Sequence, residues 1–250
     1  MKRILVCEDE VPIREFVVIN LKRAGYDVVD VCTGDEALEV FAAAEKANEP
    51  FDIALLDIMM PGENDGASVC KILREKNRTL GIIMLSAKVQ EMDKVNCLMN
   101  GADDYVTKPF SLSELIARVD AVHRRVEIAK PDSSAAVSAG NEKPLQEIDS
   151  GPFRINLEKR TFSKNGTAID MTQVEYHILE FFMRNPGIAL DRKSILTSIW
   201  GETFYGDEKV IDVNIHRLRT KIEDDPSKPT YIRTVWGYGY KWGENEIDSQ

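Results

Sequence analysis

The sequence predicts two folded domains of mixed helix and strand, joined by a flexible linker. Over residues 1–126, five short apolar runs alternate with amphipathic helical stretches, a pattern typical of a doubly wound parallel (βα)5 sheet. Half of residues 127–152 are Ser, Ala, Pro or Gly and none is aromatic, which indicates a linker that buries too little apolar surface to fold. Residues 153–243 predict an α+β domain, and residues 244–250 form an acidic tail.

Each predicted strand of the first domain is a short run rich in β-branched residues. The five strands are expected at residues 4–6, 28–31, 53–56, 82–85 and 105–106. Helical stripes separate them, with apolar residues three or four positions apart. Two such stripes are Ile13, Phe16, Val17 and Leu21, and Leu112, Leu115, Ile116 and Val119. The second domain reverses this order, with strands near residues 153–170, three helices, and strands near residues 231–235 and 239–242.

Composition excludes several classes of protein. The chain has 250 residues, 43% of them hydrophobic and 30% charged, which is typical of a folded globular protein. Runs without charged residues are far shorter than the roughly 20 apolar residues of a membrane-spanning helix, so we expect no membrane insertion. The N-terminal apolar run is too short for a signal peptide, and the four cysteines are too far apart to suggest a metal pair. We therefore expect a cytoplasmic protein with reduced thiols.

Polar residues follow the predicted strands where each strand ends. Glu8 and Asp9 follow the first strand, Asp57 the third, Ser86 the fourth and Lys108 the fifth. Ligands of doubly wound sheets bind at the carboxyl ends of the strands, so these side chains are expected to meet at one edge. Clustered carboxylates repel one another unless a cation joins them, and hard oxygen ligands favour Mg²⁺. The set predicts phosphoryl transfer to a carboxylate, whereas one acidic residue alone would fit an ordinary solvated loop.

The residues around this site resemble the receiver domain of bacterial two-component response regulators, which has a flavodoxin-like fold. The motifs that carry the resemblance are the Glu8-Asp9 pair, Leu-Leu-Asp57-Ile-Met-Met-Pro-Gly, Leu-Ser86-Ala and Gly-Ala-Asp-Asp-Tyr105-Val-Thr-Lys108-Pro109-Phe. By resemblance, Asp57 accepts a phosphoryl group from a sensor histidine kinase. The resemblance also implies that Mg²⁺ is held by Glu8, Asp9, Asp57 and the carbonyl of Met59.

The same resemblance assigns the remaining site residues. Ser86 and Lys108 would contact the phosphoryl oxygens, and the Lys108-Pro109 bond is expected to be cis. The loop at residues 61–66 departs from the usual receiver pattern because it is one residue longer. Lys88 flanks the site, and we hypothesise that it affects the lifetime of the phosphoryl group. Inward movement of Ser86 would let Tyr105 follow and re-form the face made by the fourth helix, fifth strand and fifth helix.

That face predicts a dimer interface. In the OmpR/PhoB subfamily such charged residues pair across a symmetric dimer. The resemblance suggests the pairs Lys94–Glu114, Asp103–Arg125 and Asp104–Arg118. Without the resemblance, the same residues would fit a solvated charged surface.

The net charge of −10 argues against nucleic-acid binding when it is taken alone. The acidity lies mainly in residues 1–152, however, and residues 209–221 carry four basic residues against Asp212. An inward stripe of Ile211, Ile215, Leu218 and Ile222 leaves Lys209, Val213, His216, Arg217 and Thr220 on the opposite face. A helix of this kind suits a DNA major groove, although the pattern also fits an ordinary solvated helix.

The surrounding residues resemble the winged helix-turn-helix domain of the OmpR/PhoB subfamily. The segments that carry this resemblance begin at Met171, Ser194, Val213 and Ile232. It implies base contacts from Lys209, Asn214 and Arg217, and phosphate or positioning contacts from Arg219, Trp200 and Tyr240. The hairpin that includes Thr234 and Trp236 would be the wing, with Trp236 where many relatives have arginine. By the same resemblance, residues 201–207 would form the loop that contacts RNA polymerase.

These observations predict a phosphorylation-activated transcription regulator that dimerises and binds direct repeats in double-stranded promoter DNA. It is not expected to be an enzyme beyond its own phosphoryl transfer and slow dephosphorylation. A haloacid-dehalogenase-like phosphatase would need an Asp-x-Asp pair, but Met59 stands two residues after Asp57. A second alternative keeps both domains with a receiver that dimerises constitutively, and the complete Asp57, Ser86 and Lys108 set argues against it.

Overall fold

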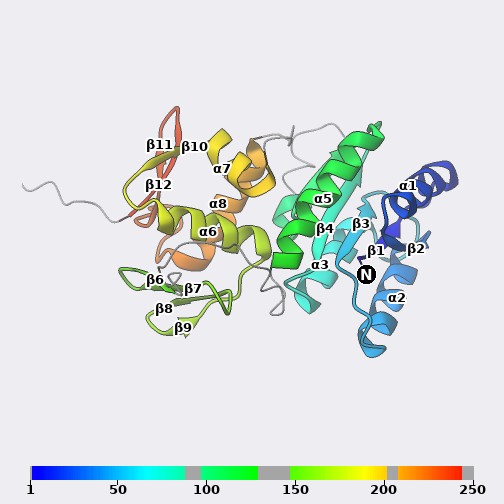
Figure 1. Cartoon of the computed structure of the whole chain (residues 1–250), viewed down its shortest axis with the longest axis horizontal. Helices are drawn as coiled ribbons and strands as arrows, with labels where there is room; N and C mark the ends of the chain where they lie inside the picture. The colour runs from blue at the N-terminus through cyan, green and yellow to red at the C-terminus, as the bar shows by residue number, and fades with distance from the viewer. Residues whose placement is uncertain (1, 88–96, 129–146, 202–207, 244–250) are drawn as a thin grey trace, which may run out of the picture. The chain divides into compact units, whose positions relative to one another are not determined.

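The computed structural model describes residues 2–87, 97–128, 147–201 and 208–243. The chain divides into two compact units, Met1–Val126 and Glu127–Gln250 (Figure 1). Among the described residues, no helix is both long and apolar enough to cross a membrane. All four cysteines are free thiols, and three of them are buried.

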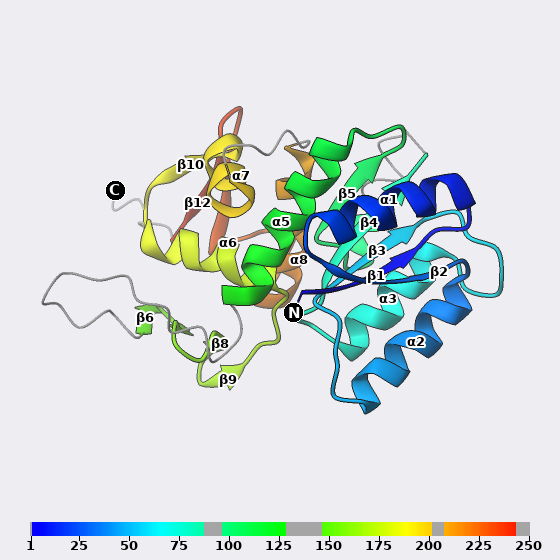
Figure 2. The same ribbon diagram turned by 45° about the vertical axis from the view of Figure 1, so that its right-hand side comes forward.

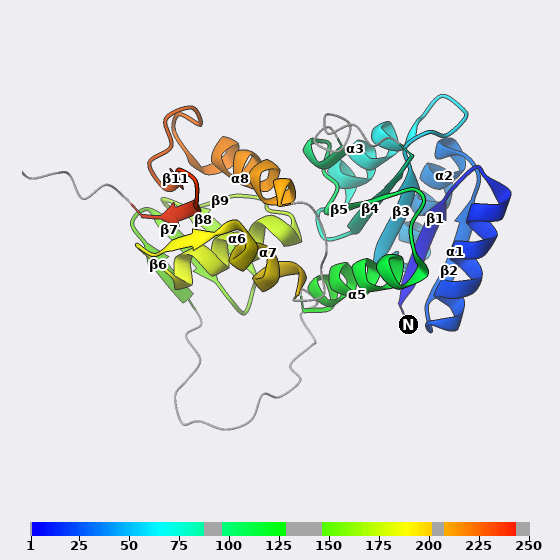
Figure 3. The same cartoon turned by 90° about the horizontal axis from the view of Figure 1, so that it is seen from above.

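The first unit is the predicted doubly wound sheet, which confirms that part of the fold class. Its five parallel strands lie in the order β2-β1-β3-β4-β5. The strands are β1 (Arg3–Cys7), β2 (Asp27–Val31), β3 (Ile53–Asp57), β4 (Gly81–Ser86) and β5 (Asp104–Thr107). The described helices are α1 (Val11–Arg23), α2 (Gly34–Lys46), α3 (Gly66–Lys76) and α5 (Leu112–Ile128). Helices α1 and α5 cover one face of the sheet, and α2 and α3 cover the other (Figures 2 and 3).

Local signals in the sequence set where the helices begin. Pro12 lies in the first turn of α1, where a missing backbone N–H costs nothing. The Thr33 hydroxyl accepts the amide of Glu36 at 3.2 Å and caps α2. The Asp65 carboxylate accepts the amide of Ser68 at 2.8 Å and caps α3. These caps fix the loops at the carboxyl end of the sheet, where the polar residues lie.

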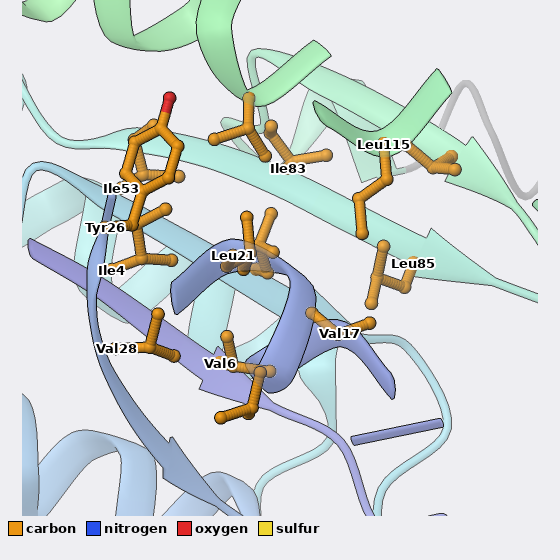
Figure 4. Close-up of a cluster of buried hydrophobic side chains, with 14 of the residues drawn as sticks. Ile4, Val6, Val17, Leu21, Tyr26, Val28, Ile53, Ile83, Leu85 and Leu115 are labelled. Carbon is orange, nitrogen blue, oxygen red and sulfur yellow. The ribbon is translucent and has the colours of Figure 1, made fainter. Parts of the chain in front are cut away.

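The core between the sheet and helices α1 and α5 consists of aliphatic side chains. Ile4 and Val6 of β1 lie against Val17 and Leu21 of α1, and Leu115 of α5 extends the same layer (Figure 4). Full burial of such a side chain contributes about 1.5–3 kcal/mol. One predicted stripe residue differs, because Phe16 is 43% exposed. Val18, which the predicted stripe did not include, is buried on the inward face of α1 instead.

The second unit has the predicted α+β architecture. A four-stranded antiparallel sheet contains β6 (Glu147–Ser150), β7 (Phe153–Asn156), β8 (Thr161–Lys164) and β9 (Thr167–Ala168). Helices α6 (Gln173–Arg184), α7 (Arg192–Trp200) and α8 (Lys209–Ile222) follow. The second sheet, in the order β10-β12-β11, contains β10 (Ala189–Asp191), β11 (Ile232–Val235) and β12 (Gly239–Trp242). Figure 1 shows the β11–β12 hairpin projecting from this unit.

The boundary of the second unit corrects the predicted linker of 127–152. Helix α5 continues to Ile128, and β6 begins at Glu147 inside the expected linker. Strand β6 pairs with β7, placing Ile148 opposite Ile155, and the Trp242 indole donates to Ser150 Oγ at 2.9 Å. Strand β6 and its partner β7 are joined by Gly151 and Pro152, and the Ser, Gly and Pro content of the stretch predicted a linker instead of this short strand. The rest of the linker, residues 129–146, and the tail at 244–250 lie outside the described residues.

Candidate functional site

The three predicted acidic residues meet at the carboxyl edge of the first sheet. Glu8 and Asp9 follow β1, and Asp57 is the last residue of the neighbouring strand β3. One carboxylate oxygen from each lies within 4.8 Å of the others. Glu8 is 0% exposed and Asp57 is 4% exposed, so water can screen their charges only weakly. The chain therefore holds three carboxylates in a place where their repulsion is strong.

Lys108 supplies the nearest positive charge. Its Nζ donates to Glu8 Oε1 at 2.7 Å and to Asp57 Oδ2 at 2.8 Å. Burial by itself would lower the pKa of Lys108, but the hydrogen bonds to Asp57 and Glu8 outweigh burial, and the pKa lies above its ordinary value. The Lys108-Pro109 peptide bond is cis, as the resemblance predicts. One ammonium group thus serves two carboxylates and remains protonated.

The pKa of Glu8 indicates that the single ammonium group of Lys108 does not neutralise the negative charge of the three carboxylates. Burial is the largest influence on the Glu8 carboxyl, and together with the charge of Asp57 it overcomes the Lys108 hydrogen bond and raises the pKa of Glu8 to about 7. Glu8 Oε2 is buried and has no hydrogen-bond partner in the described parts of the chain. An unsatisfied carboxylate oxygen beside two other carboxylates fits a hard divalent cation, and Mg²⁺ suits this donor set.

The other predicted residues lie close to the acidic group in the fold. Ser86 ends β4 and is 3% exposed, whereas Tyr105 in the adjacent β5 is 6% exposed. Strand β5 lies beside β4 with Tyr105 opposite Met84. The Met59 side chain is 58% exposed, and its amide lies 3.4 Å from Asp57 Oδ1. The metal role of its carbonyl stays a prediction.

Arg14 is a site residue that the sequence reasoning missed. Its Nη1 donates to the carbonyl oxygens of Glu8 at 2.6 Å and Asp9 at 3.1 Å. The guanidinium therefore fixes the backbone that carries two of the three carboxylates. A basic residue one turn into the helix after an acidic pair could have indicated this contact. Lys88 lies outside the described residues.

Three of the predicted dimer-interface residues are buried and paired within this chain. Asp103 is 2% exposed and lies 2.7 Å from Arg74 Nη2, and Asp104 is 0% exposed and lies 3.1 Å from Arg118 Nη1. Arg118 Nη2 also contacts Glu114 Oε1 at 2.9 Å. The alternative interpretation, an open solvated surface, therefore does not fit Asp103, Asp104 and Arg118. Lys94 and the side chain of Arg125 lie outside the described residues, and the pairs across a dimer remain predictions.

The outer face of helix α8 is narrower than the predicted one. Asn214 is 0% exposed, and its Nδ2 donates to the Val210 carbonyl at 2.8 Å. The Arg217 side chain is only 10% exposed and lies 3.1 Å from Glu175 Oε1 of α6. Val213 is also buried. Asn214 and Arg217 are covered in this conformation because α8 packs against neighbouring elements over more than its aliphatic stripe, and their role in base contacts stays a prediction.

The exposed positions of α8 are His216 and Thr220, and Lys209 is half-buried, as are Asp212, Arg217, Arg219 and Lys221. His216, Thr220 and Lys209 lie on the face that the sequence predicted to point outward. This narrower polar surface is what α8 offers to a partner.

Two predicted phosphate contacts are also buried. Trp200 is 1% exposed, and the Tyr240 hydroxyl donates to Asp212 Oδ1 at 2.6 Å while its side chain is 5% exposed. Both side chains are packed inside the domain in this conformation, and their role as contact residues stays a prediction. Arg219 donates to the Ile232 carbonyl at 2.7 Å and to Thr234 Oγ1 at 2.9 Å, joining α8 to the hairpin.

The tip of the β11–β12 hairpin exposes two aromatic side chains. Trp236 is 91% exposed and Tyr238 is 50% exposed. Gly237 between them has a φ of +72°, a left-handed conformation that favours glycine. The turn therefore holds an indole away from the core. Residues 202–207, most of the predicted polymerase loop, lie outside the described residues.

Comparisons with known proteins agree with the two predicted domains. Residues 4–120 match the response regulator receiver domain, and residues 166–242 match the C-terminal domain of transcriptional regulatory proteins. The chain is similar to the response regulator DrrB of Thermotoga maritima, an OmpR/PhoB homologue, with 30% identity over 97% of this chain and 99% of that chain and a TM-score of 0.48.

Two further solved structures are similar. A cysteine-to-serine mutant of RitR is 26% identical over 98% of this chain and 100% of that chain, with a TM-score of 0.71. The receiver domain of the Francisella response regulator 1452 is 36% identical over 50% of this chain and 98% of that chain, with a TM-score of 0.45.

The fold and the two sites define a regulatory protein that joins a receiver to a DNA-binding domain. The chain belongs to the two-component response regulators of the OmpR/PhoB type, and it is a transcription factor.

Proposed function

We propose that phosphorylation of Asp57 by a sensor histidine kinase switches this regulator into a DNA-binding dimer. The observation that carries the proposal is the position of Lys108, whose Nζ bridges Glu8 and Asp57 at 2.7 and 2.8 Å inside a buried acidic group. A buried lysine shared by two carboxylates can turn toward added phosphoryl oxygens without an external counterion. The arrangement therefore supports Asp57 as a nucleophile toward phosphorus.

In the proposed step, a carboxylate oxygen of Asp57 attacks the phosphorus of a phosphohistidine. The new P–O bond forms as the P–N bond breaks, and the imidazole leaves with the electron pair. Lys108 and the Ser86 hydroxyl then stabilise the phosphoryl oxygens. Glu8, Asp9, Asp57 and the Met59 carbonyl would hold Mg²⁺, which supplies positive charge against the phosphoryl and carboxylate oxygens when bound.

The switch follows from competition for the same groups. A phosphoryl group adds about −1.5 to −2 charge, which draws Lys108 and Ser86 toward it. Strand β4, which ends at Ser86, lies between β3 with Asp57 and β5 with the buried Tyr105. Tyr105 would move into the space that Ser86 leaves. Because Asp104 and Arg118 are already paired within the chain, dimerisation would exchange this pair for the same pair between two copies. Because the number of ion pairs is unchanged by such an exchange, dimers are favoured only when phosphorylation also changes the shape of the face that contains Tyr105 and Arg118.

DNA recognition is proposed for α8 and the hairpin. Lys209, His216 and Thr220 form the accessible face of α8 for the major groove, and Trp236 at the hairpin tip would contact the adjacent minor groove. A dimer would place two such domains on direct repeats of promoter DNA, and RNA polymerase is the expected further partner. Because neither the chain nor its second domain carries a net positive charge, binding would depend on two linked half-site contacts.

The test is Mg²⁺-dependent labelling of the full chain by the phosphodonor acetyl phosphate. Wild type should incorporate one phosphoryl group per chain and elute as a dimer, and Asp57→Asn should do neither. Glu39→Gln removes the same charge from the exposed side of α2 and should behave as wild type, since Glu39 lies outside the acidic group. Absence of incorporation, or incorporation that persists in Asp57→Asn, contradicts the proposal.

A further inference from the structure

The loop that follows the phosphoacceptor strand is anchored to α2. This loop comprises residues 61–66 and is one residue longer than the receiver pattern. The Asp35 carboxylate accepts the Glu63 amide at 3.1 Å and the Asn64 side-chain amide at 2.5 Å. Asp35 lies in the first turn of α2, a capped helix on the adjoining edge of the sheet. One side chain therefore ties down the two residues in the middle of the loop.

Three glycines bring the loop into close contact with its surroundings. A Cβ on Gly62 would lie 2.6 Å from Asp35 Oδ2, and one on Gly34 would lie 2.0 Å from the Asn64 carbonyl oxygen. A Cβ on Gly66 would lie 1.8 Å from the Asp57 carbonyl oxygen. Contacts this short leave no room for a side chain. The loop is packed against both α2 and the phosphoacceptor.

The same loop holds the backbone beside the acidic group. The Gly66 amide donates to the Ile58 carbonyl at 3.1 Å, which closes residues 58–66 into a ring at the end of β3. Met59 lies inside this ring, and its carbonyl is the backbone oxygen that the proposed function assigns to Mg²⁺. A shift at residues 62–64 is therefore transmitted to residues 58–60 through a short, closed segment.

We infer that Asp35 is a positioning residue, which holds the 61–66 loop so that the backbone after Asp57 is preorganised for a divalent cation. This inference rests on the proposed function, because it assigns a support to the same site. Groups that orient metal ligands typically change metal affinity by about 10–100-fold when they are removed. Asp35 acts through backbone held by two hydrogen bonds, so we expect the lower end of that range.

The experiment compares Asp35→Ala with Glu39→Ala in the full chain. Glu39 is an exposed acidic residue on the same helix, so its removal changes the charge equally without touching the loop. Hydrogen exchange of the Glu63 amide should accelerate at least about tenfold in Asp35→Ala, and Mg²⁺ titrated by calorimetry should bind about tenfold more weakly. Glu39→Ala should match wild type in both measurements.

A double-mutant cycle separates positioning from general loss of stability. Asn64→Ala removes one of the two donors and should weaken Mg²⁺ binding less than Asp35→Ala does. The double variant should bind Mg²⁺ no more weakly than Asp35→Ala alone, because both changes remove the same contact between Asp35 and Asn64. Asp35→Asn keeps the side-chain shape and one acceptor oxygen, and should fall between wild type and Asp35→Ala.

The outcomes distinguish this inference from the proposed function. Wild-type Mg²⁺ affinity in Asp35→Ala, despite faster exchange of the Glu63 amide, overturns the inference and leaves the proposed function standing. An equal loss in Glu39→Ala overturns it as well, because the effect would then be one of charge. If wild type itself binds no Mg²⁺, both the inference and the proposed metal site are wrong.

Discussion

Two buried glutamates, one in each unit, experience opposite electrostatic environments. Glu8 in the first unit and Glu175 in the second are each 0% exposed and each paired with a lysine. Burial and the charge of Asp57 raise the pKa of Glu8 to about 7, against the effect of Lys108. Burial would also raise the pKa of Glu175, but Arg217 and Lys221 outweigh it and the pKa lies below its ordinary value.

The difference lies in how many cations each carboxylate has. Glu175 accepts the Thr172 amide at 2.8 Å, and Arg217 and Lys221 lie 3.1 and 2.6 Å from its oxygens. Each glutamate has one oxygen without a hydrogen-bond partner among the described residues, but Glu8 shares its one lysine with Asp57 and lies beside two other carboxylates. A buried carboxylate with matched cations is part of the scaffold. One with too few cations marks a place where a cation or phosphoryl group acts.

Removing Glu175 should have the largest effect on stability. Glu175→Ala leaves Arg217 and Lys221 without their buried partner and removes the capping box of α6, so we expect a loss of about 3–5 kcal/mol in the free energy of unfolding. Scanning calorimetry of the full chain should show the second unit unfolding at a clearly lower temperature. Glu180→Ala, which removes a surface pair with Arg184, should change stability by less than about 1 kcal/mol. A loss below about 1 kcal/mol for Glu175→Ala would contradict the comparison.

Neutralising Glu8 should act in the opposite direction and less strongly. Because its pKa is raised in the folded state, the protonated carboxyl stabilises the fold below about pH 4.5, and this stability is lost as the pH rises through about 7. Without Mg²⁺, Glu8→Gln should therefore be more stable than wild type at pH 8, by about 1–3 kcal/mol, and the difference should shrink toward pH 5. Denaturant unfolding at both pH values in EDTA checks this. A difference that does not depend on pH would show that Glu8 does not carry the excess charge.

Trp236 should have the smallest effect on stability. It is 91% exposed, so Trp236→Ala should change the free energy of unfolding by less than about 0.5 kcal/mol. An aromatic contact with bases is worth about 1–3 kcal/mol, so affinity for promoter DNA should fall about tenfold or more. Gel-shift titration of the phosphorylated protein measures this, with Trp236→Phe expected to retain most of the affinity. Unchanged affinity in Trp236→Ala would remove the hairpin tip from the DNA interface.

The acidic site was predictable because its position follows from sheet topology. Asp57 and Lys108 end or follow buried parallel strands, and such strand ends necessarily share one edge. The outer face of α8 was not predictable in the same way. A helical stripe locates one buried side, but Arg217 is covered by Glu175, which lies more than forty positions earlier in α6.

Short strands and long-range contacts limited the prediction further. Strand β6 could not be predicted from its own Ser- and Pro-rich residues, because it is stabilised by pairing with β7 and by the hydrogen bond from Trp242. Asp35 acts on the backbone of a loop 28 residues away in the sequence, and residue type alone does not indicate such a contact. Burial of Trp200 and Tyr240 likewise depends on packing among α7, α8 and the second sheet.

The exposure of Trp236 also gives the protein a built-in optical reporter. The chain has three tryptophans, and all lie in the second unit. Trp200 and Trp242 are each 1% exposed, so a water-soluble quencher such as acrylamide can reach Trp236 while the other two stay shielded. The quenchable, red-shifted part of the indole emission therefore belongs to the hairpin tip. Its loss on adding DNA would follow engagement of that tip in real time, without a label and without signal from the receiver.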